Sequence, residues 1–129
     1  MPAPRFHVAS PPANRALVLF DGDCRFCQYW AGSWRKEYAG RLDVAASQTA
    51  RGRFPEIPLS AYDEALQLIE PDGAVYSGAY AALRARAAGS RSRGLLLPLY
   101  ESVPGLAGLM EFGYRIVARN RRVFSMFMR

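Results

Sequence analysis

Cysteine and histidine are scarce in this sequence, and their scarcity excludes several kinds of protein. The 129 residues include two cysteines, Cys24 and Cys27, and one histidine, His7. A secreted scaffold held by disulfides carries more cysteines, whereas a bond between Cys24 and Cys27 would close almost no loop and restrict the unfolded chain little. A metal site built on two thiolates needs two further ligands, and His7 lies in a proline-rich N-terminal stretch. The cysteine pair is therefore better suited to redox chemistry than to stapling.

Long hydrophobic runs are also missing. Residues 1–14 contain no continuous apolar segment of the kind found in secretory signals, and the apolar run 95–100 is too short to span a membrane. We therefore expect a cytoplasmic protein with no transmembrane segment. Glycine-rich phosphate loops and Gly-x-Ser-x-Gly nucleophile elbows are absent too, so nucleotide-dependent and serine-hydrolase chemistry is disfavoured.

The composition is that of a globular domain. Half of the residues are hydrophobic and 22% are charged, and the length suits one domain. Residues 1–14 hold four prolines and no periodicity, so we expect a flexible arm there and a single domain over residues 15–129. The formal charge is +6, which favours anionic partners without identifying one, and no feature indicates a specific nucleic acid.

The apolar pattern predicts a βαβ unit, then a β-hairpin, then helices. Residues 16–20 form a continuous apolar run, which is typical of a strand buried on both faces. A right-handed crossover through the first helix should make the first two strands parallel. We predict strands at 16–20, 42–46, 65–69 and 74–76, and helices at 24–38, 47–53, 78–88 and from 104 onward.

Turn and capping residues predict where the helices begin. Asp21-Gly22-Asp23 is a turn sequence, and Asp23 is the expected N-cap of the helix that carries the cysteines. Ser47 and Ser77 are the expected caps of the helices that follow them. Residues 91–94 read as a polar linker, and residues 95–103 as apolar and partly helical.

The last helix is expected to be amphipathic. One face should carry Leu106, Leu109, Met110, Gly113 and Val117, with Arg115, Arg119 and Arg122 mostly elsewhere. We interpret it as a packing helix with a solvated basic side. The alternative is a surface for acidic lipid or nucleic acid.

The spacing of Cys24 and Cys27 permits reversible disulfide formation. Residues three apart on a helix share a face and lie within disulfide reach, and the helix start favours an anionic sulfur. We therefore expect Cys24 to attack, Cys27 to resolve the mixed disulfide, and Asp21 to accept the proton of Cys27. Arg25 favours the thiolate while Asp21 and Asp23 oppose it, so the direction of electron flow stays open.

These residues resemble the DCC family, whose signature is Asp-x-x-Cys-x-x-Cys. Leu17–Phe20 followed by Asp21-Gly-Asp-Cys24-Arg-Phe-Cys27 matches its opening. The likeness continues through Ala46-Ser-Gln48, Leu68–Gly78 and Tyr114–Arg121, and covers about residues 16–125. Members are described as predicted thiol-disulfide oxidoreductases with a thioredoxin-like fold.

The resemblance implies that Asp21, Cys24 and Cys27 are the family's signature positions. With the order of elements, it predicts an α/β fold: a thioredoxin-like βαβ unit, a β-hairpin and α-helix, and additional C-terminal helices. The implied protein uses no bound cofactor, acts on a protein or small-molecule thiol or disulfide, and is served by a thioredoxin or glutathione system. Thioredoxins place a cis-proline before the strand that follows the active-site region, but here Pro58 lies several residues too early. Two alternatives stay open: a non-enzymatic interaction module with a basic C-terminal helix, and a metal-binding accessory protein.

Overall fold

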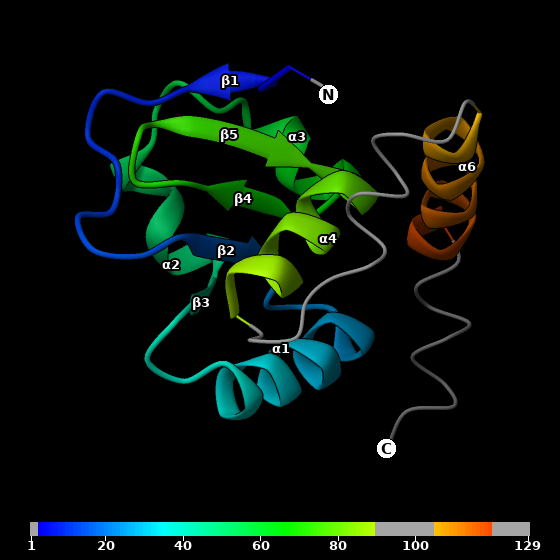
Figure 1. The fold of residues 1–129 in the computed structure, drawn as a ribbon, viewed down its shortest axis with the longest axis horizontal. Helices are drawn as coiled ribbons and strands as arrows, with labels where there is room; N and C mark the ends of the chain where they lie inside the picture. The colour runs from blue at the N-terminus through cyan, green and yellow to red at the C-terminus, as the bar shows by residue number, and fades with distance from the viewer. Residues whose placement is uncertain (1–2, 90–104, 120–129) are drawn as a thin grey trace.

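One mixed β-sheet with helices on both faces organises the chain (Figure 1). The computed structural model describes residues 3–89 and 105–119. The strands are β1 (Phe6–His7), β2 (Leu17–Phe20), β3 (Asp43–Ala46), β4 (Gln67–Ile69) and β5 (Ala74–Ser77). The helices are α1 (Arg25–Glu37), α2 (Ser47–Ala50), the 3₁₀ turn η1 (Arg51–Arg53), α3 (Leu59–Glu64), α4 (Gly78–Gly89) and α6 (Leu106–Arg119).

The strand order β1-β5-β4-β2-β3 confirms the predicted α/β fold. Strands β2 and β3 are parallel and joined through α1, with Val18 opposite Val44. Strand β4 runs antiparallel to β2 and forms a hairpin with β5. This is a thioredoxin-like arrangement of a βαβ unit followed by a hairpin and a helix. It makes β2, at whose end the cysteine motif begins, an interior strand between β4 and β3.

Alternate residues of β2 serve two separate cores, which is why the whole strand is apolar. Leu17 and Leu19 pack with residues of α2 and α3 and with the fully buried Phe54, which follows η1. Val18 packs on the other face, which α1 and α4 cover (Figure 1). A strand so buried on both faces is a rigid support for the loop at its end.

Two elements of the structure were not expected from the sequence. Strand β1 forms within the stretch expected to be a flexible arm, and it pairs antiparallel with β5, with Val8 buried beside it. Helix α3 forms over residues left unassigned, and it buries Ala61 and Tyr62. Both elements are too short to show a periodic pattern. The predicted linker 91–94, the apolar segment 95–103, the helix start at Pro104 and the position of Arg122 lie outside the described residues.

The two predicted serine caps are wrong, although the helices form where expected. Ser47 is buried as the first residue of α2, which has no side-chain cap. Ser77 donates its hydroxyl to Gln67 Oε1 inside the fold. The first turn of α4 is instead capped from outside by the carboxylate of Glu111, which accepts from the backbone N–H groups of Ala79 at 3.1 Å and Tyr80 at 3.0 Å.

Helix α6 packs against the domain through only part of the predicted face, of which Met110 and Val117 are half-buried. Its contacts run along α4, where Met110 and Tyr114 join the apolar cluster around Tyr80. Leu109, predicted to face inward, is 68% exposed, and Phe112 and Ile116 are exposed beside it. Arg115 and Arg119, predicted to lie away from the packed side, line a groove between α6 and the rest of the domain. Within the two described stretches, no helix has the length and apolar character needed to cross a membrane.

Candidate functional site

The cysteine motif begins where β2 leaves the sheet. The carboxylate of Asp21 accepts the backbone N–H of Asp23 at 3.0 Å, and the carbonyl of Asp21 accepts that of Cys24 at 3.2 Å. These two bonds fold residues 21–24 into a tight turn that starts the helix. The expected strand–turn–helix context of the pair is therefore present.

Cys24, rather than Asp23, is the N-cap of α1. Its backbone is extended, and its Sγ accepts the backbone N–H of Cys27 at 3.3 Å. The prediction that Asp23 caps this helix is therefore wrong. The physical reason is the turn itself, which holds the helix start one residue later and leaves the Asp23 carboxylate 3.4 Å from the Gln48 amide nitrogen. Cys24 Sγ thus occupies the position where a helix terminus stabilises an anion.

Cys27 lies one turn deeper. It is 6% exposed and packs with Phe20 and Ala31, whereas Cys24 is only half-buried. The two cysteines are present as separate thiols. Cys24 Sγ lies 3.3 Å from the backbone nitrogen of Cys27, so the two side chains leave neighbouring positions on the same turn of α1. The more accessible sulfur belongs to Cys24, which the sequence predicts to attack. The buried sulfur belongs to Cys27, which the sequence predicts to resolve the mixed disulfide.

A small cavity of about 50 Å³ lies beside Cys27. Asp21 and Cys27 both line it, so the two residues that the sequence paired border the same space. Ala65 and Leu66, which lead into β4, form part of its opposite wall, and Tyr114 of α6 covers it. The Tyr114 hydroxyl accepts the backbone N–H of Leu66 at 3.0 Å, so α6 is fastened at the edge of this cavity.

Gln48 holds the motif turn from the neighbouring strand end. Its Oε1 accepts the N–H of Gly22 at 2.9 Å, and its Nε2 donates to Asp21 Oδ1 at 2.9 Å. Ala46 packs closely from the same side, since a Cβ at Gly22 would meet the Ala46 Cβ at 2.9 Å. Sequence reasoning assigned Gln48 no role. The family likeness at residues 46–48 could have indicated such a role. Strand β3 runs parallel to β2, so the residues that follow β3 lie beside the turn that follows β2.

Gln28 contributes a second amide to the same turn. Its Nε2 donates to the carbonyl of Gly22. Gln28 is the residue after the second cysteine, so this bond ties the first turn of α1 back to the motif. Glutamine side chains thus bind both backbone polar groups of Gly22, its N–H and its C=O.

A buried polar group next to the cavity was also missed. Tyr62 of α3 is 4% exposed and lines the cavity with Cys27, and its hydroxyl makes no hydrogen bond to any residue in 3–89 or 105–119. Burial raises the pKa of Tyr62 above its ordinary value of 10.0, and the charge of Arg51 opposes part of that rise. Gln67, fully buried, fixes this wall by donating to the carbonyls of Ala61 at 2.9 Å and Ala65 at 3.2 Å.

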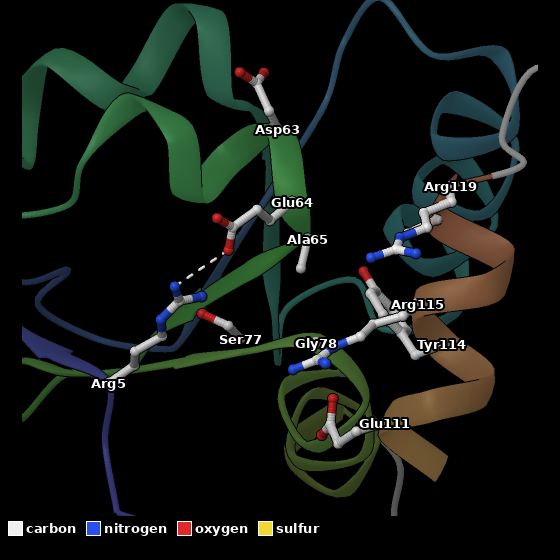
Figure 2. A pocket seen from close by; sticks show the side chains of 11 residues that line it. Arg5, Asp63, Glu64, Ala65, Ser77, Gly78, Glu111, Tyr114, Arg115 and Arg119 are labelled. Atoms are coloured by element: carbon white, nitrogen blue, oxygen red, sulfur yellow. Dashed lines mark hydrogen bonds and ion pairs between the residues drawn. The ribbon is translucent and has the colours of Figure 1, made fainter. Parts of the chain in front are cut away.

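A larger groove of about 890 Å³ adjoins the cavity (Figure 2). Glu64, Ala65, Tyr114 and Ala118 line both spaces. One wall carries the ion pair of Arg5 and Glu64, 3.2 Å apart, and α6 supplies Arg115 and Arg119 from the other side (Figure 2). The sequence did not predict this groove, because it depends on how α6 docks.

Metal ligation finds little support in the geometry. Over the described residues, no group of three His, Cys, Asp or Glu side chains is arranged to hold a metal ion. His7 lies in β1 at the edge of the sheet, separated from β2 by strands β5 and β4.

The comparison with protein families gives one match. The family model described as DCC1-like thiol-disulfide oxidoreductase matches residues 18–126, which include the turn, both cysteines, the hairpin and α6. No curated protein and no solved structure matches the chain significantly.

Proposed function

The chain belongs to the DCC1-like thiol-disulfide oxidoreductase family, and we propose that it exchanges thiols and disulfides through Cys24 and Cys27. The observation that carries the proposal is the geometry of Cys24, whose half-buried sulfur caps α1 and accepts the N–H of Cys27. A sulfur in that position has backbone dipole and N–H groups directed at it, and these stabilise a thiolate.

The proposed reaction has two exchange steps. The Cys24 thiolate attacks a substrate disulfide, which forms a mixed disulfide and releases one substrate thiolate. Cys27 then gives up its proton and attacks Cys24 Sγ, which forms the Cys24–Cys27 disulfide and releases the second substrate thiolate. One pair of electrons thus passes from the cysteines to the substrate. A cytoplasmic dithiol or thiol reductant, of the thioredoxin or glutathione type, would return the pair to its reduced form.

Asp21 is proposed as the acceptor of the Cys27 proton. Both residues line the cavity beside the buried sulfur, which supports a transfer directly or through water. The Asp21 carboxylate is held by the Gln48 amide and the Asp23 N–H, so its direction is fixed before the substrate arrives.

The decisive experiment separates attack from resolution. A Cys27→Ser variant should accumulate mixed disulfides on Cys24 when it is incubated with a small disulfide. Mass spectrometry of the intact protein should show the added mass of one half of that disulfide. A Cys24→Ser variant should show no such adduct, because Cys27 is buried. The proposal fails if neither variant forms an adduct and the wild-type pair does not equilibrate with glutathione.

A matched pair of carboxylate variants tests Asp21. Asp21→Asn keeps an Oδ1 acceptor for the turn but removes the base, so resolution of the mixed disulfide should slow by on the order of a hundredfold while adduct formation stays fast. Asp23→Asn removes the same charge two residues away, from a side chain that does not line the cavity, and should leave resolution unchanged. Equal slowing in both variants would show that net charge, not proton acceptance, is responsible.

A further inference from the structure

Helix α6 carries three large apolar side chains on its exposed side. Leu109 is 68% exposed, Phe112 64% and Ile116 46%. At about 100° of rotation per residue, the three fall within roughly 60° of arc and form one line along the helix, which we call the α6 apolar stripe. Single exposed apolar residues are ordinary on a protein surface, whereas several in register on one helix mark a contact surface.

The packing of α6 on the domain does not use this stripe. Met110 and Tyr114 join the apolar cluster around Tyr80, and the Tyr114 hydroxyl binds the backbone of Leu66. Val117 lines the cavity beside Cys27. These residues lie on the opposite side of the helix, so the stripe is not needed to hold α6 on residues 3–89.

Positive charge accompanies the stripe. Arg115 and Arg119 are exposed, and in helical projection they lie about 60° and about 20° from Phe112, on the side away from Leu109. Neither forms an ion pair with a residue that the structure describes. The lining of the groove beside them is balanced, with three arginines and three acidic residues. The excess charge therefore lies beyond the groove, since residues 120–129, which follow α6 directly, add three arginines and no acidic residue.

We propose that the α6 apolar stripe and the arginines beside it bind the surface of an anionic lipid bilayer. A helix in the plane of a bilayer buries Phe, Leu and Ile side chains among the acyl chains, and its arginines extend to the headgroups. Each basic residue near an anionic surface adds attraction, and the formal charge of +6 has the same effect at longer range. A second copy of α6 matches the stripe less well, because it would bring the arginines of two helices together.

Vesicle flotation tests the binding and its dependence on charge. The full chain is mixed with vesicles of phosphatidylcholine alone, or of phosphatidylcholine and phosphatidylglycerol in equal parts. Binding to the anionic vesicles should be stronger by roughly tenfold or more, and it should weaken when the salt concentration rises from about 0.1 M to about 1 M. Absence of binding to the anionic vesicles would overturn the inference.

Apolar substitutions locate the surface. Phe112→Ala together with Ile116→Ala should weaken binding to anionic vesicles by roughly tenfold, because less apolar area enters the bilayer. The matched control is Tyr29→Ala together with Leu59→Ala, which removes two side chains on α1 and α3 that are 62% and 61% exposed. The control should bind as the wild type does.

The basic residues have a control pair of their own. Arg115→Gln together with Arg119→Gln should weaken binding by roughly tenfold. Lys36→Gln together with Arg86→Gln removes the same net charge from exposed positions on α1 and α4 and should weaken it less. Circular dichroism should show the same helix content in all four double variants. Equal losses in the α6 variants and their controls would overturn the inference.

Two further outcomes would assign the surface to a different partner and overturn the lipid assignment. One is a dimer in sedimentation velocity that the apolar α6 variant dissociates, without vesicle binding. The other is retention on duplex DNA that the arginine variant abolishes, without vesicle binding. The inference is independent of the exchange reaction, so a Cys24→Ser, Cys27→Ser protein should bind vesicles as the wild type does. Vesicle binding without thiol oxidation would support this inference and overturn the exchange reaction alone.

Discussion

The sulfur cap on α1 makes a quantitative prediction that separates the structural role of Cys24 from its chemistry. Replacing Cys24 by Ala removes the acceptor of the Cys27 N–H and leaves that donor without its partner at 3.3 Å. Loss of an oxygen N-cap usually costs about 1 kcal/mol, and a thiol is a weaker acceptor. We therefore expect the free energy of unfolding to fall by about 0.5–1 kcal/mol, or a decrease in Tm of about 2–5 °C.

Serine is the informative partner variant. Its hydroxyl is a better N-cap than a thiol, so Cys24→Ser should be as stable as the wild type or slightly more stable, although its chemistry is lost. Asp23→Ala should cost less than about 0.5 kcal/mol, because that side chain is exposed and does not cap the helix. Urea denaturation of the reduced proteins measures all three. A larger loss for Asp23→Ala than for Cys24→Ala would refute the assignment of the cap.

Three further perturbations test the turn and the cavity. Gly22→Ala should destabilise the protein by about 1–3 kcal/mol in urea unfolding, because the new Cβ would lie 2.9 Å from that of Ala46; an unchanged midpoint would contradict the close packing. Gln48→Met should cost about 1 kcal/mol, and a double-mutant cycle with Asp21→Asn should give a coupling energy of about 0.5–1.5 kcal/mol, against zero if the contact is unimportant. Burial raises the pKa of Tyr62, so the unfolded chain loses this proton at lower pH than the native protein does, and wild-type stability should fall as pH rises above 10. Tyr62→Phe should fall less steeply above pH 10 in the same denaturation series, and parallel curves would exclude a contribution from this group.

Sequence patterns predicted the central fold because its apolar residues recur at the spacing typical of strands and helices. The buried run of β2 and the turn residues of the β4–β5 hairpin are local signals, and both elements appear where expected. Strand β1 and helix α3 carry no such signal. Two residues of β1 cannot show alternation, and α3 gains its stability from burying Ala61 and Tyr62 rather than from its own sequence.

The site shows the same division between local and distant causes. The roles expected for Cys24 and Cys27 follow from their spacing at a strand–helix junction, which the sequence displays. The identity of the cap does not follow, because aspartate is intrinsically the better N-cap. The preference is overridden by the turn at residues 21–24, which starts the helix one residue later and leaves the Asp23 carboxylate near the amide of Gln48 in α2. Such contacts depend on strand pairing, and a linear pattern does not contain them.

The rotation of α6 is fixed by groups on other elements, which explains why Leu109 was wrongly expected on its packed face. Glu111 accepts from the first turn of α4, and Tyr114 accepts from Leu66, three residues further along the same face. The first contact requires Gly78, whose φ is +73° and where a Cβ would come 2.6 Å from the Glu111 carboxylate. Because these contacts set the rotation, they also direct Arg115 into the groove. The position of Arg115 therefore depends on Gly78, a glycine on another helix.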